Sequence, residues 1–361
     1  MNTQFSSENH QLVNVDRERY NSLDGLRAYA AIGIVLMHIL ANIAIKPSEN
    51  YITLKLIPFF TDFTLLFMIV SGFSLCCGYY DRIKSGDVTP NTFYKKCYAR
   101  ILPYFASLCI LDLMMNPSLK AFYETFANLT LCFNLLPNPK IGVIGVGWFL
   151  GVIFLFYILF PFFVFMLDNK RRAWKSLVIA LVFVLIAMLY FYTPEFVPKS
   201  PGRTNMIFCA PLFLSGGIAY LYRKPIFDLV RTNNLICVVF VIALTVSFFL
   251  FGPLVKNEFA HYIIENGMFV IWLLYAIGSR DIILNNRVVK YISGISMEIY
   301  LAHMVIYRVV EKIHIDHFIS QPDILYIVTC ILVIGGVICF AHVMKYYALR
   351  KVMNWMEKKN E

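Results

Sequence analysis

The sequence predicts an all-α integral membrane protein, built as a single bundle of about ten transmembrane helices. Of its 361 residues, 59% are hydrophobic and only 15% are charged, a composition too apolar for a soluble domain of this size. The apolar residues fall in runs long enough to cross a bilayer as helices. Short basic clusters between these runs account for the net charge of +10, so we expect the lipid bilayer as a partner and no nucleic acid.

Ten segments have the length and apolar content of a membrane-spanning helix. They are residues 24–45, 58–79, 101–116, 145–167, 174–194, 206–222, 235–252, 261–279, 291–310 and 323–347. Between the third and fourth of them, residues 117–144 hold a semi-apolar stretch bounded by prolines. This pattern predicts an external loop that contains an interfacial or re-entrant segment.

The distribution of basic residues predicts the orientation of the bundle. With the N-terminus inside the cell, the inner segments carry 22 of the 32 Lys and Arg residues and the outer segments carry 9. The positive-inside rule then places both termini in the cytoplasm. We expect one domain without a cleavable signal peptide: a cytoplasmic segment 1–22, a transmembrane domain 23–347 and a basic cytoplasmic tail 348–361.

The first span carries an acid, a guanidinium and an imidazole, groups that hydrocarbon tolerates poorly and that are usually functional in a membrane. Helical geometry places Asp24, Arg27 and His38 on one face, with His38 about 21 Å beyond Asp24 along the axis. This predicts a site with a charged pair at the membrane surface and an imidazole well inside. The alternative is a structural His38 that donates to a backbone carbonyl of a neighbouring helix.

The ninth span repeats this pattern of polar residues. Ser296, Tyr300 and His303 fall within about 60° on a helical wheel, whereas Glu298 points elsewhere. His303 lies close to the depth of His38, so we expect the two imidazoles to flank one cavity. A purely structural histidine is again the alternative.

A basic cluster opens the third span at its cytoplasmic end. Lys95, Lys96 and Arg100 either anchor this helix at the membrane surface or bind the phosphates of a nucleotide-bearing donor, with Arg27 one turn inside the same face. The nine cysteines lack metal-ligand spacing, so we expect them to pack as small hydrophobic residues and predict no metal site.

These motifs together resemble the acyltransferase-3 family, the bacterial membrane acyltransferases that decorate surface carbohydrates. The opening signature is Leu23-Asp24-Gly25-Leu26-Arg27-Ala28, followed eleven residues after the arginine by His38. Further matches occur in order at Phe67–Phe73, Arg100–Pro103, Trp148–Leu150, Phe156–Tyr157, Phe160–Pro161 and Ser296–His303. Two positions depart from the family pattern, because Cys97 stands where members often have an arginine and Ile153 where many have a glutamate.

The resemblance implies transfer of an acyl group, commonly acetyl, from cytoplasmic acyl-CoA to a carbohydrate hydroxyl, with no permanently bound cofactor. It implies a multi-pass protein of the bacterial inner membrane. His38 would act as general base or transient acyl carrier, with Asp24 orienting it or Arg27. The residues implied to hold donor phosphates are Arg27, Lys96 and Arg100. Those implied to contact an oxyanion or the acceptor are Ser71, Tyr300 and His303.

Two other functions fit ten helices with buried polar groups. A polysaccharide exporter is one, although the sequence lacks inverted repeats and paired Gly/Pro-broken spans. A non-catalytic partner of a glycan synthase is the other, but it would leave Asp24, Arg27 and His38 without a task. The sequence predicts neither the acceptor sugar nor the oligomeric state.

Overall fold

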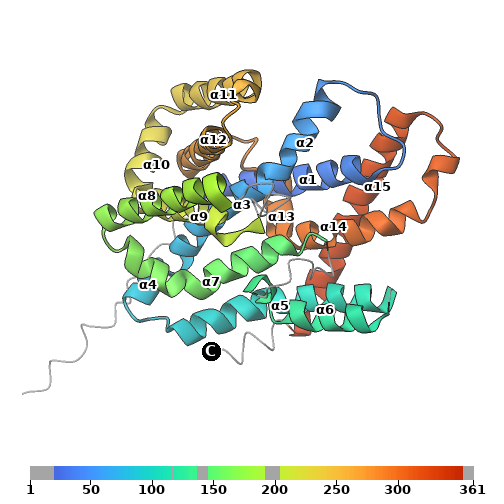
Figure 1. Cartoon of the computed structure of the whole chain (residues 1–361), viewed down its shortest axis with the longest axis horizontal. Coiled ribbons are helices and arrows are strands. Elements are labelled where there is room, and N and C mark those ends of the chain that lie inside the picture. The colour runs from blue at the N-terminus through green and yellow to red at the C-terminus, as the bar shows by residue number, and fades with distance from the viewer. Residues whose placement is uncertain (1–19, 116, 136–144, 192–203, 353–361) are drawn as a thin grey trace, which may run out of the picture.

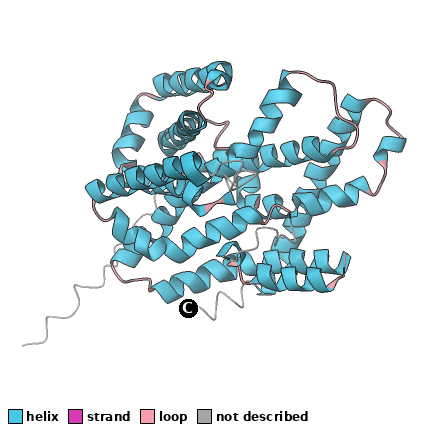
Figure 2. Ribbon diagram, viewed as in Figure 1, coloured by secondary structure: helices cyan, strands magenta, loops and turns pink. Residues whose placement is uncertain are grey.

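The computed structural model describes residues 20–115, 117–135, 145–191 and 204–352. Every regular element in these ranges is helical, which confirms the all-α membrane class (Figures 1 and 2). Most of the predicted N-terminal segment 1–22 and the end of the tail 348–361 lie outside the described residues.

Helix α1 (Leu23–Asn42) lies at the centre of the bundle (Figure 1). It packs against α3 (Phe63–Leu75), α12 (Glu258–Gly278), α14 (Ser296–Glu311) and α15 (Pro322–Val343). In the apolar stretch of α1, 61% of the residues are buried inside the protein. The corresponding share is 11% for the peripheral helix Asn234–Leu254. The helix that carries the predicted acid, guanidinium and imidazole is therefore one of the two most enclosed by protein, together with Trp148–Leu167.

The other spans surround this centre. Several are long helices that contain π-helical or 3-10 turns. The second span combines η1 Ile52–Leu56, α2 Ile57–Phe59, η2 Phe60–Asp62, α3, η3 Cys76–Tyr80 and α4 Asp81–Lys84. The remaining elements are α5 Pro90–Met115, α6 Leu119–Leu129, η4 Phe133–Leu135, α7 Trp148–Leu167, α8 Lys170–Ile186, η5 Ala187–Phe191, α9 Met206–Leu221, α10 Arg223–Thr232, α11 Asn234–Phe251, η7 Gly252–Leu254, α13 Arg287–Gly294, η8 Ile315–His317 and η9 Met344–Ala348.

Each predicted span overlaps a helix, but the sixth ends at a sharp bend and the ninth is interrupted. Among the described residues, eight helices are long and apolar enough to cross a membrane, or nine if α9 and α10 count as one span bent by 73°. The ninth predicted span is interrupted at Ile295, between α13 and α14. The predicted semi-apolar loop contains α6, which lies beside α5 and exposes a large apolar surface at Leu119, Phe122 and Phe126. An amphipathic helix of this kind suits the membrane interface.

Glycines allow α3 and α9 to approach closely. A Cβ atom on Gly72 would lie 2.3 Å from the carbonyl oxygen of Phe213, and one on Gly216 would lie 2.1 Å from that of Ile69. Any side chain at either position would push the two backbones apart, as is usual at small-residue helix contacts in membranes. This contact fixes the rotation of α3 and with it the direction of Ser71.

The break between α13 and α14 is held by an ion pair from the last helix. Lys345 donates to the carbonyl oxygen of Gly294 at 2.5 Å and pairs with the Glu298 carboxylate at 2.8 Å. The Glu298 side chain is only 4% exposed. The lysine thus satisfies a carbonyl at the end of α13 and neutralises a buried charge at the start of α14.

The orientation of the bundle can be tested by labelling. In a background where the exposed cysteines Cys77 and Cys339 are replaced by serine, we expect an impermeant maleimide to label Lys120→Cys in intact cells and not Lys351→Cys. The reason is the excess of basic residues on one side of the membrane, which predicts a cytoplasmic C-terminus. Labelling of Lys351→Cys but not Lys120→Cys would show that the orientation is reversed.

Candidate active site

A cavity of about 980 Å³ lies beside α1 and is the candidate site. Its walls come from α1, the α3–η3–α4 helix, α5, α7, the α9–α10 bend and the α13–α14 break. The predicted residues Asp24, Arg27, Ser71, Arg100 and Tyr300 all line it. Both interrupted spans therefore contribute to its wall.

One part of the lining is strongly cationic. Five basic side chains and two carboxylates line the cavity, which gives it a surplus of positive charge. The basic residues are Arg27, Arg82, Arg100, Arg223 and Lys224, and the acids are Asp24 and Asp81. Arginines in a partly enclosed site suit the bidentate recognition of phosphate oxygens.

Arg27 is held in place by its neighbours on α1 and α3. Its guanidinium lies 3.7 Å from Asp24 and donates to the Ser74 hydroxyl. Asp24 also accepts a hydrogen bond of 2.7 Å from Ser293 on α13. Because Asp24 neutralises only part of the nearby positive charge, it orients Arg27 without cancelling the attraction of the cavity for anions.

The remaining cations occupy different surroundings. Arg223 donates to the carbonyl of Tyr220 at 3.0 Å and lies 3.9 Å over the ring of the same residue. The Tyr220 hydroxyl in turn donates to Asp81 at 2.8 Å. Arg100 is exposed in the cavity and has no hydrogen bond or ion pair with any of the described residues. Its donors are available to a ligand.

The π-helical turn η3 forms part of the cavity wall. Cys77, Gly78 and Tyr79, three consecutive residues of this turn, all line the cavity. Consecutive residues of a regular α-helix point in directions 100° apart, so a widened turn helps to bring them to one wall. Single π turns inside α-helices are frequent at functional sites.

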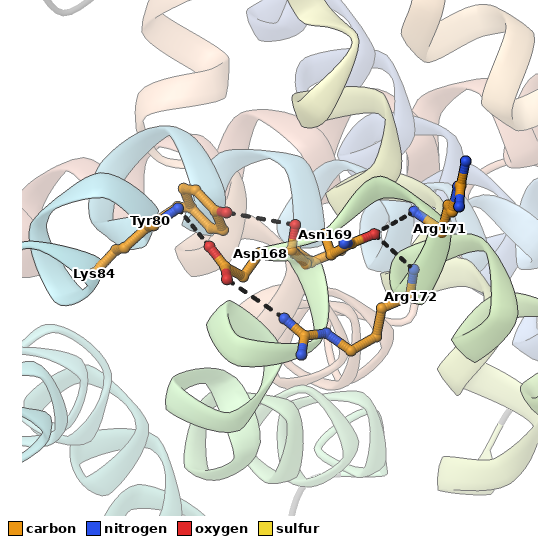
Figure 3. Close-up of polar contacts among 7 residues, drawn as sticks. Tyr80, Lys84, Asp168, Asn169, Arg171 and Arg172 are labelled. Atoms are coloured by element: carbon orange, nitrogen blue, oxygen red, sulfur yellow. Dashed lines mark hydrogen bonds and ion pairs between the residues drawn. The ribbon is translucent and has the colours of Figure 1, made fainter.

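A polar network ties the end of this helix to a neighbouring turn (Figure 3). Lys84 pairs with Asp168, between α7 and α8, and Arg172 lies 3.4 Å from the same carboxylate. The Tyr80 hydroxyl donates to the carbonyl of Leu167 at 3.4 Å. The hydrogen bond from Lys84 lowers the pKa of Asp168. These contacts fix the α4 wall of the cavity.

The cavity ends on aromatic rings at its apolar side. Phe67, Phe149 and Tyr300 line it, and their ring centroids lie 5.4 to 6.4 Å from one another. Leu150 and Ile153 line the same region. The isoleucine that stands in place of the family glutamate therefore adds apolar surface to the cavity.

The two predicted histidines meet next to these rings. The ring centroids of His38 and His303 lie 4.8 Å apart, and that of Tyr300 lies 6.0 Å from His303. Neither histidine lines the cavity itself. The two imidazoles adjoin each other, as their similar depth predicts, but they do not flank this cavity as expected, because the cavity reaches only as far as Tyr300.

The hydrogen bonds of the histidines define their tautomers. His38 Nδ1 lies 3.0 Å from the carbonyl oxygen of Ile34, and His303 Nδ1 lies 2.6 Å from that of Tyr300. A carbonyl oxygen can only accept, so each Nδ1 carries the proton and each Nε2 holds a lone pair. Each Nδ1 thus bonds to a carbonyl of its own helix. His303 Nε2 is buried without a hydrogen-bond partner among the described residues.

Other site residues fall in places that the sequence did not indicate. Lys96 lies one turn before Arg100 on α5 and does not line the cavity. Its predicted contact with the donor stays a prediction. Arg82, Arg223 and Lys224 line the cavity but were counted only as basic residues of inner segments. The buried Cys97 is part of the hydrophobic core.

The described residues also include one possible metal-ligand cluster, which the sequence interpretation missed. The ligand atoms of His314, Asp316 and His317 lie within 4.8 Å of one another. All three side chains are exposed, in the turn after α14. They take no part in the cavity.

Comparison with known proteins agrees with this geometry. Residues 20–343 match the family described as "Acyltransferase domain". The chain is also 32% identical over 88 residues to "Protein 2 in picA locus" of Rhizobium radiobacter, an alignment that covers 24% of this chain and 41% of that protein. The chain thus matches less than half the length of this curated relative, and no solved structure is significantly similar to it. Because the family match extends from the start of α1 to the end of α15, this multi-pass membrane protein belongs to the acyltransferase-3 family.

Proposed function

We propose that the protein is a transmembrane O-acyltransferase that moves an acyl group from cytoplasmic acyl-CoA to a hydroxyl of a surface or exported polysaccharide. The acyl group that we propose is acetyl. The single observation that carries this proposal is the division of the cavity into a cationic part and an aromatic end beside two histidines. A CoA thioester has the same division, with phosphates at one end and an uncharged pantetheine arm at the other. Acetyl-CoA acts as a donor substrate here and is not a resident cofactor.

The chemistry assigned to the histidines is general base catalysis by His38. Its Nε2 lone pair takes the proton of the sugar hydroxyl while the hydroxyl oxygen attacks the thioester carbonyl. The carbon–sulfur bond breaks, the CoA thiolate leaves with the electron pair, and the imidazolium returns its proton to that thiolate. A transient acyl-imidazole on His38 is the competing route, and a labelled acyl-enzyme trapped without acceptor would identify it.

The proposed location is the inner membrane of a bacterium, with the basic end of the cavity toward the cytoplasm. The donor then enters where the Lys and Arg residues of the inner segments gather. The acceptor approaches the histidine pair from the opposite side of the membrane.

The donor assignment predicts a selective loss of CoA binding. We expect Arg100→Ala to weaken CoA binding by roughly tenfold, because this unpaired guanidinium is available for phosphate oxygens. Lys96→Ala should have a smaller effect, since its side chain does not line the cavity. Binding of CoA to detergent-purified protein measures both.

Arg287→Ala is the matched control for this experiment, because Arg287 is an exposed arginine at the start of α13 that does not line the cavity. Unchanged CoA affinity in Arg100→Ala would remove Arg100 from the donor site. Equal losses in Arg100→Ala and Arg287→Ala would indicate a non-specific charge effect.

The composition of the cell's surface glycan separates the enzyme from an exporter. In cells that lack this chain we expect the polymer to remain and its ester-linked acyl groups to disappear. Loss of the whole polymer would instead favour a polysaccharide exporter or a required partner of the glycan synthase.

A further inference from the structure

We propose that Phe67, Phe149 and Tyr300 form a constriction between the donor cavity and the histidine pair, and that this constriction restricts the enzyme to short acyl groups. The proposal rests on the proposed function, because it concerns the acyl group that the donor delivers. It assigns the choice of acyl chain length to three rings from three different helices.

The positions of the rings support a constriction. Each ring lines the end of the cavity, and the closest pair, Phe149 and Tyr300, has centroids 5.4 Å apart. Tyr300 contacts the cavity on one side and lies 6.0 Å from the His303 ring on the other. A thioester that reaches His38 from the cavity must therefore pass these rings.

Tyr300 is fixed at both its backbone and its hydroxyl. Its hydroxyl donates to the carbonyl oxygen of Val146 at 3.0 Å, and its own carbonyl accepts from His303 Nδ1 at 2.6 Å. The ring is thus anchored to the segment before α7 and coupled to the position of His303. An anchored ring keeps a narrow opening better than a freely rotating one.

The space beyond the rings is closely packed. Ile34, Ile299 and Ala302, which adjoin the histidines in α1 and α14, have no exposed surface. Neither histidine lines the donor cavity or the smaller cavity beside Leu36 and α15, so packed side chains adjoin the imidazoles. A two-carbon acyl group needs little rearrangement there, whereas each further methylene must displace packed side chains.

The test compares acyl donors of different length. Phe67→Ala and Phe149→Ala are assayed in host membrane vesicles that expose their cytoplasmic face and lack the wild-type chain. The vesicles receive acetyl-, butyryl- or hexanoyl-CoA, and mass spectrometry measures the acyl esters on the extracted glycan. We expect wild-type protein to prefer acetyl, and the variants to raise the hexanoyl-to-acetyl ratio by about tenfold or more.

Two further variants sharpen the comparison. Tyr300→Phe keeps the ring but removes its anchor to Val146, so it should shift the ratio in the same direction by a smaller factor. Phe162→Ala is the matched control, because Phe162 lies on α7 like Phe149 but is 66% exposed on the outside of the bundle. Its ratio should equal that of the wild type.

The outcomes distinguish the two proposals. If wild-type protein transfers acetyl and the variants bind CoA but keep the wild-type ratio, the constriction is wrong and the proposed function stands. If wild-type protein transfers no acyl group from any of the three donors, the proposed function itself fails. Should an alanine variant not fold, as judged by CoA binding, Phe67→Leu and Phe149→Leu provide the same comparison with a smaller cavity.

Discussion

His38→Gln is expected to abolish acyl transfer to the glycan while leaving CoA binding intact. The variant keeps a hydrogen-bonding side chain of similar size but has no lone pair basic enough to take the hydroxyl proton. Removal of a general base commonly lowers the rate by about 100- to 10,000-fold. CoA affinity should not change, because His38 lies beyond Tyr300 and does not line the donor cavity.

The experiment measures glycan acylation in cells and CoA binding to purified protein. His317→Gln is the matched control, since His317 is an exposed histidine in the turn after α14. A His38→Gln variant that is present at wild-type level and still acylates the glycan at a comparable rate would make His38 a packing residue. Parallel loss of protein level, CoA binding and activity would equally indicate a structural role.

The sequence predicts the features that depend on a single helix. The distance along an unbroken helix follows from the number of residues, so the shared face of Asp24, Arg27 and His38 on α1 could be calculated without any structure. The depth of His303 was calculated for a continuous helix, whereas α13 and α14 are separated at Ile295. The contact between His38 and His303 at 4.8 Å depends additionally on α1 and α14 being neighbours. From the sequence, the proximity of these two helices could only be expected, because the two histidines have similar depths.

Features that depend on several helices could not be predicted in this way. Arg82, Arg223 and Lys224 lie in short inner segments, where basic residues usually mark only the side of the membrane. Their convergence with Arg27 requires the α9–α10 bend of 73° and the π-helical turn η3. Pro225, in the first turn of α10, marks a helix boundary but not the angle of the bend, and η3 contains no proline at all.

The aromatic end of the cavity illustrates the same limit. Phe67 and Phe149 were noted only as members of family motifs, and the chain has 32 phenylalanines, most of which face lipid or core. Only the packing of α3, α7 and α14 separates these two from the rest. Lys96 is the opposite case, because the sequence predicts it as a site residue but it does not line the cavity, although Arg100 one turn further along α5 does.

Arg27→Ala is expected to lower CoA affinity by about 10- to 100-fold, the range for losing hydrogen bonds to a charged group. The substitution removes a cation that Asp24 and Ser74 hold in the cavity wall. It also leaves Asp24 without its nearby guanidinium, so the local field becomes less favourable for phosphate. Arg27→Lys should recover only part of the affinity, because an ammonium retains the charge but not the planar pair of donors.

Pantetheine, which lacks the phosphates of CoA, separates phosphate binding from general damage to the cavity. If Arg27 binds phosphate, the Arg27→Ala variant should bind pantetheine as well as the wild type does and lose affinity only for CoA. Arg287→Ala should leave both affinities unchanged, since that arginine is exposed outside the cavity. Equal losses for CoA and pantetheine would mean that Arg27 shapes the cavity without contacting the phosphates, and unchanged CoA affinity would remove Arg27 from the donor site.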